Sequence, residues 1–165
     1  MPLAEYADEI TEVTGAYVLE TQEISFRYQT AVERQVEALT SSGTTADLDG
    51  AMTIVRSETA NFLALLDDAM TRYHTDVSEM EPPLEVVDRH DAYVAIIASV
   101  RSTLPASRDA LAETTSFEEV LASLVGSGFA DGQQAWTAAC ESLESAIREA
   151  GRGADLKCVR DTVDS

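Results

Sequence analysis

The chain almost lacks lysine. Lys157 is the only one, and 11 basic residues stand against 30 acidic ones, so the formal net charge is -19. Carboxylates bind water and cations strongly, whereas long lysine stems add apolar surface that concentrated salt would drive together. The acidic surface is therefore a halophilic-type composition, although a GC-rich genome that favours arginine and alanine explains the same bias.

The same acidity excludes nucleic acid as a partner, because so negative a surface repels phosphate backbones and the arginines form no basic stripe. No window approaches the roughly 20 apolar residues of a membrane span. Residues 1–10 have no basic segment followed by an apolar run, which a signal peptide requires. The sequence predicts a chain that does not span a membrane and that contains no export signal of its own.

Apolar residues recur in steps of three and four through most of the chain. With 165 residues and 45% hydrophobic composition, the chain is long enough for a single helical-bundle domain over residues 1–165. One stripe runs from Leu3 to Leu39 and a second from Leu48 to Val77, which predicts two long amphipathic helices.

Prolines mark the next boundaries. Pro82 and Pro83 disfavour the helical conformation before them and predict a loop over residues 78–83. A third helix follows over residues 86–104, and Pro105 should kink or end it.

Capping residues place the last two helices. Ser116 and Glu119 have the spacing of a capping box, which predicts a short helix closed by residues 126–128. Asp131 is the predicted cap of a final helix, and residues 151–153, Gly-Arg-Gly, should end it. No segment alternates with a period of two. The predicted fold is all-α: an antiparallel up-down four-helix-type bundle with an extra short helix and a C-terminal tail.

Histidines and tyrosines offer the candidate chemistry. His74 and His90 flank the predicted 78–83 turn, so they are the candidate ligands of copper, zinc or haem. The alternative is that His90 packs in the core and bonds a neighbour while His74 lies at the margin. Neither has the Glu three residues earlier that a di-iron bundle needs. The tyrosines on the apolar stripes are expected in the core with their hydroxyls at its rim: Tyr17, Tyr28, Tyr73 and Tyr93.

Cys140 and Cys158 are the only cysteines. The chain between them is long enough to fold back along the last helix, so a disulfide is geometrically allowed; two reduced thiols in a cytosolic protein are the alternative. The disulfide would tie down a C-terminal tail that frays without it, and we predict that the disulfide forms.

The second half of the chain resembles uncharacterised exported proteins and lipoproteins of GC-rich or halophilic prokaryotes. The similarity lies in Met80-Glu-Pro-Pro83, His90, Ala139-Cys-Glu-Ser-Leu143 and Gly151-Arg-Gly-Ala-Asp-Leu-Lys-Cys158. The resemblance implies export and a Cys140–Cys158 bridge but no activity. The chain departs from the pattern because no signal peptide or lipobox cysteine precedes the match.

These observations predict a non-enzymatic binding or interaction domain outside the cytoplasm, with a protein or small-molecule partner and no cofactor. No phosphate loop, Gly-x-Ser-x-Gly motif or activated nucleophile is present, so no catalytic residue is predicted. The first alternative is a metal- or haem-binding bundle that uses His74 and His90. The second is a cytosolic, salt-adapted regulatory protein, which would require free thiols.

Overall fold

A computed structural model describes residues 1–42, 48–125 and 129–158 of the chain. Within these ranges the protein is all-α, as predicted, and no strand is present. The helices are α1 (Leu3–Ser42), α2 (Leu48–Ser78), α3 (Val87–Ala112), α4 (Phe117–Val125) and α5 (Phe129–Glu149).

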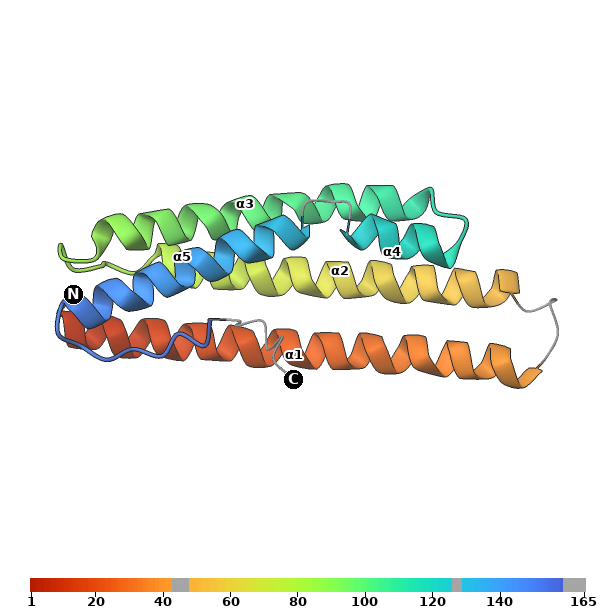
Figure 1. The fold of residues 1–165 in the computed structure, drawn as a ribbon, viewed down its shortest axis with the longest axis horizontal. Coiled ribbons are helices and arrows are strands. Elements are labelled where there is room, and N and C mark those ends of the chain that lie inside the picture. Colours follow the sequence, from red (N-terminus) through yellow and green to blue (C-terminus); the bar gives the residue numbers. More distant parts are fainter. Residues whose placement is uncertain (43–47, 126–128, 159–165) are drawn as a thin grey trace.

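The long helices lie side by side along the long axis of the molecule, and consecutive long helices run in opposite directions (Figure 1). α1 packs mainly on α2, α2 on α3, and α3 on α5. α4 and α5 follow one another along α3 and together replace a single fourth helix. With 40 residues α1 is about 60 Å long, whereas α5 has 21 residues and is about 30 Å long. The backbones of α1 and α5 hardly contact, so side chains form the seam between them: the ring centroids of Tyr17 and Trp136 lie 5.7 Å apart.

Two predicted helix boundaries were wrong. Pro105 lies inside α3, which continues to Ala112, so the predicted end at this residue is wrong, whereas the alternative, a kink, stays a prediction. The side chain of Pro105 is exposed, so the carbonyl of Arg101 that loses its helical N–H partner can bond water. Asp131 is not a cap, because α5 begins at Phe129 and places this carboxylate in its first turn, where the helix dipole favours it. The predicted stop at residues 126–128 lies outside the described residues.

The predicted capping box at the start of α4 is present. The backbone N–H of Glu119 donates to Ser116 Oγ over 3.2 Å, and the Glu119 carboxylate accepts the backbone N–H of Thr115 over 2.5 Å. These donors favour the charged carboxylate, and the Thr115 N–H contributes most to lowering the pKa of Glu119. The short helix therefore begins at a fixed residue.

α5 ends as its Gly-Arg-Gly sequence predicts. Gly151 has a φ of 92°, a left-handed conformation that suits glycine, and its N–H donates to the carbonyl of Arg148. The N–H of Arg152 donates to the carbonyl of Ile147, which completes a Schellman motif. This turn reverses the chain and sends residues 152–158 back along the bundle, next to α1 (Figure 1).

Replacing Gly151 with alanine should lower the free energy of unfolding by about 1 kcal/mol, because the added Cβ strains the left-handed conformation. Gly153→Ala is the matched control, since Gly153 has ordinary φ and open space around it. Urea unfolding of the two variants measures the difference. Equal stabilities would contradict the role assigned to Gly151.

Candidate functional site

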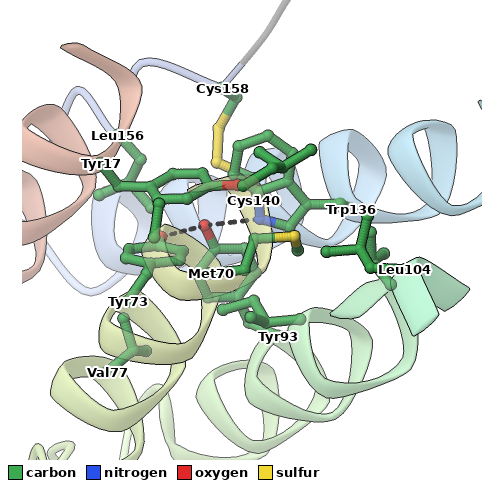
Figure 2. Close-up of a cluster of buried hydrophobic side chains, with 14 of the residues drawn as sticks. Tyr17, Met70, Tyr73, Val77, Tyr93, Leu104, Trp136, Cys140, Leu156 and Cys158 are labelled. Atoms are coloured by element: carbon green, nitrogen blue, oxygen red, sulfur yellow. Dashed lines mark hydrogen bonds between the residues drawn. A yellow bond between two sulfur atoms is a disulfide. The ribbon is translucent and has the colours of Figure 1, made fainter. Parts of the chain in front are cut away.

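A chain of buried hydrogen bonds joins side chains inside the bundle (Figure 2). The Tyr73 hydroxyl bonds Thr14 Oγ1 over 2.9 Å and the Tyr93 hydroxyl over 2.5 Å. The indole N–H of Trp136 donates to the same Tyr93 oxygen over 3.0 Å. Tyr17 stacks on Tyr73, with 4.4 Å between ring centroids. The network joins α1, α2, α3 and α5 through side chains.

These tyrosines keep their protons at neutral pH. Burial raises the pKa of Tyr17 and Tyr73 well above the usual phenol value and that of Tyr93 to about 12. The prediction that they lie in the core is confirmed for these three, but the hydroxyls of Tyr73 and Tyr93 point at each other inside the bundle instead of reaching its rim. Tyr28 is half-buried and bonds Thr59 over 3.0 Å.

His90 is buried, as one of the two sequence interpretations expected, and its Nδ1 bonds the Tyr6 hydroxyl over 2.9 Å. Burial disfavours the imidazolium and lowers the pKa of His90, and the nearby Asp91 carboxylate opposes this shift. His74 is only half-buried. No group of three or more His, Cys, Asp or Glu side chains in the described part of the chain could hold a metal, and the His74 and His90 metal site stays a prediction.

Cys140 and Cys158 form a disulfide, with 5.7 Å between their Cα atoms, within the usual range for a bridge. Cys140 is fully buried and Cys158 is 8% exposed. The bridge fixes the tail that follows α5 (Figure 2), and Leu156 of this tail is fully buried in the core. The structure thus has the tail folded inward along the last helix, as the sequence predicted.

Glu144 is a buried carboxylate that the sequence prediction missed. It accepts the backbone N–H of Leu156 over 3.2 Å and pairs with Arg148 over 2.6 Å, and its Oε2 lies 3.9 Å from Cys158 Sγ. The carboxylate therefore ties the tail to α5 beside the disulfide. The available signal was an acid that follows the core residue Leu143 and lies four residues before an arginine.

A cleft of about 320 Å³, here called the aromatic cleft, is lined by residues of α1, α2, α3 and α5. Its floor includes the buried side chains of Tyr17, Leu66 and Trp136, and the side chain of Phe26, which is 68% exposed, stands at its edge. None of its described lining residues is charged. The lining residues are Tyr17, Thr21, Gln22, Ser25, Phe26, Gln29, Phe62, Leu66, Met70, Val100, Gln133 and Trp136.

A second cleft, of about 810 Å³, lies between α1 and the tail and is here called the tail cleft. Gln22 lines both clefts, so they meet along α1, and together they are called the α1 groove. Leu19, which is 69% exposed, stands at the edge of the tail cleft as Phe26 does in the aromatic cleft. The tail cleft is lined by Gly15, Val18, Leu19, Gln22, Glu144, Arg148, Ala154, Asp155, Lys157 and Cys158.

Comparison with known proteins finds no family model, no curated protein and no solved structure that matches the chain. The resemblance to exported helical domains therefore stays a prediction. Among the described helices, none combines the length and the apolar character needed to cross a membrane.

The free energy of unfolding should decrease as the pH falls, because His90 binds a proton less readily in the folded chain than in the unfolded one. The pKa of His90 is lower in the folded state, so the contribution of neutral His90 to stability is complete above the unfolded pKa of 6.5 and is lost as the pH falls below that value. Between about pH 7 and about pH 5 the unfolding free energy of the unmodified chain should drop more steeply than that of His90→Gln. Parallel curves for the two proteins would contradict the assignment.

Removal of the disulfide by a Cys140→Ala and Cys158→Ala double substitution should lower the unfolding free energy by about 3 kcal/mol, because the bridge closes a loop between residues 18 apart. The rate of amide hydrogen exchange at Leu156 should increase in the same variant, because the released tail would no longer keep the Leu156 N–H bonded to Glu144. Mass spectrometry of the unmodified chain without reductant checks the bridge itself. Two freely alkylated thiols in protein prepared under oxidising conditions would refute it.

Proposed function

We propose that this chain is a non-enzymatic binding domain that acts outside the cytoplasm and that binds the apolar part of its ligand in the aromatic cleft of the α1 groove. The observation that carries the proposal is the contrast between the aromatic cleft and the rest of the chain. A chain of net charge -19 contains a cleft whose described lining is uncharged and includes Tyr17, Phe26, Phe62 and Trp136. Concave apolar sites with a few polar groups are typical of ligand pockets.

The rim of the aromatic cleft supports binding of an uncharged or apolar group. Thr21, Ser25 and Gln133 supply hydroxyl and amide groups around an aromatic floor, and these orient a ligand without requiring it to be charged. The floor is held by the Tyr73 and Tyr93 hydrogen bonds beneath it. A site whose floor is already fixed loses little conformational entropy on binding.

The compartment is inferred from the disulfide. Cys140 and Cys158 are bonded and buried, and such bridges form and persist mainly in oxidising environments such as the extracellular space and the periplasm. The absence of free cysteine among the described residues is consistent with the same setting.

A neutral fluorophore tests the aromatic cleft. N-phenyl-1-naphthylamine should bind with one-to-one stoichiometry and quench Trp136, the only tryptophan of the chain, because this side chain lines the cleft. A sulfonated naphthalene probe should bind more weakly, since the acidic surface repels it.

The control for this titration is a pair of matched substitutions. Ser25→Phe fills the aromatic cleft and should weaken binding of N-phenyl-1-naphthylamine about tenfold or more, whereas Ser102→Phe, on the exposed side of α3, should leave it unchanged. Thermal melting of both variants confirms that they fold. No binding to the unmodified chain, or equal binding to both variants, would contradict the proposed site.

A further inference from the structure

We propose that the natural occupant of the α1 groove is an amphipathic helix of a partner protein, with an apolar stripe and basic residues beyond both ends of that stripe. This inference rests on the proposed function and specifies the partner's chemistry. Helices commonly bind in apolar grooves through side chains spaced by three and four residues.

The apolar contacts come from one line of residues on α1. Leu19 and Phe26 are seven residues apart, so they lie on the same face of the helix, and both are more than two-thirds exposed. Gly15, Gln22 and Gln29 share that face at spacings of three and four residues and line the groove with them. From Gly15 to Gln29 the stripe is about 21 Å long, which matches about four helical turns of a partner.

The architecture leaves room for a helix rather than a flat surface. α5 is about half as long as α1, and the backbones of the two hardly contact, so α1 lacks a full-length neighbour on this side. The two clefts behind Leu19 and Phe26 have volumes of about 320 and 810 Å³ and can receive side chains from a helix lying along the seam. A docked helix would pack against α1 as an additional member of the bundle.

Two carboxylates lie on the same face of α1 as Leu19 and Phe26. Glu12 lies seven residues before Leu19 and Glu33 lies seven residues after Phe26, so one carboxylate stands beyond each end of the apolar pair. Both side chains are exposed, and neither forms an ion pair with another described residue. Basic side chains at the two ends of the partner's stripe would meet them. A second copy of this chain is a poor occupant, because two chains of net charge -19 repel each other.

The test uses a labelled synthetic helix of about 20 residues, with leucines spaced by three and four in its middle and lysines at both ends. Fluorescence anisotropy at about 0.15 M salt measures its Kd for the full chain. A peptide of the same composition with the leucines out of register, and one with glutamate in place of lysine, are the ligand controls. Both controls should bind about tenfold more weakly or not at all.

Two variants of the chain test the two contacts. Leu19→Ser with Phe26→Ser should raise the Kd of the peptide about tenfold or more, whereas Leu84→Ser, which removes a side chain that is 89% exposed elsewhere, should not change it. Glu12→Gln with Glu33→Gln should raise the Kd about threefold or more and flatten its salt dependence. Asp109→Asn with Glu118→Gln changes the net charge equally at exposed positions away from the groove and should have little effect.

The outcomes separate this inference from the proposed function. If N-phenyl-1-naphthylamine binds but the lysine peptide does not, the inference is wrong and the binding domain stands. If Glu12→Gln with Glu33→Gln binds the peptide as tightly as Asp109→Asn with Glu118→Gln, the inference of basic residues on the partner is wrong. Analytical ultracentrifugation that finds a dimer of the unmodified chain, lost in the Leu19→Ser and Phe26→Ser variant, would replace the partner helix with a second copy.

Discussion

The bundle depends on the hydrogen bonds that join Thr14, Tyr73, Tyr93 and Trp136. Four helices each place one polar side chain at the same depth, and a buried hydroxyl without a partner would cost about 1–3 kcal/mol. Sliding or rotating any of these helices would break at least one bond. The network therefore fixes the relative positions of α1, α2, α3 and α5, and with them the floor of the aromatic cleft.

Periodicity was enough to predict the helices, because each buries one face and repeats its apolar residues every three or four positions. It failed where solvent or electrostatics decides a boundary. An exposed Pro105 is tolerated inside α3, and Asp131 is as favourable in the first turn of α5 as it would be at the cap.

The candidate site was only partly visible in the sequence. The disulfide and the core positions of Tyr17, Tyr73 and Tyr93 were predicted, whereas the direction of their hydroxyls depends on how the helices rotate about their axes, which one sequence does not determine. The groove depends on how α1, α5 and the tail pack together, which one sequence does not determine. Its one sequence signal was that Leu19 and Phe26 lie seven residues apart and off the apolar stripe of the first helix.

The burial of the disulfide has a kinetic consequence. Thiol–disulfide exchange requires a thiolate to reach a sulfur atom directly, and Cys140 is fully buried while Cys158 is nearly so. Cys158 lines the tail cleft, so while the tail is closed a dissolved thiol can approach the bridge only from that cleft. Detachment of residues 152–158 from Glu144 would break the hydrogen bond to the Leu156 N–H and expose the bridge further, so local opening of this segment should raise the rate of attack.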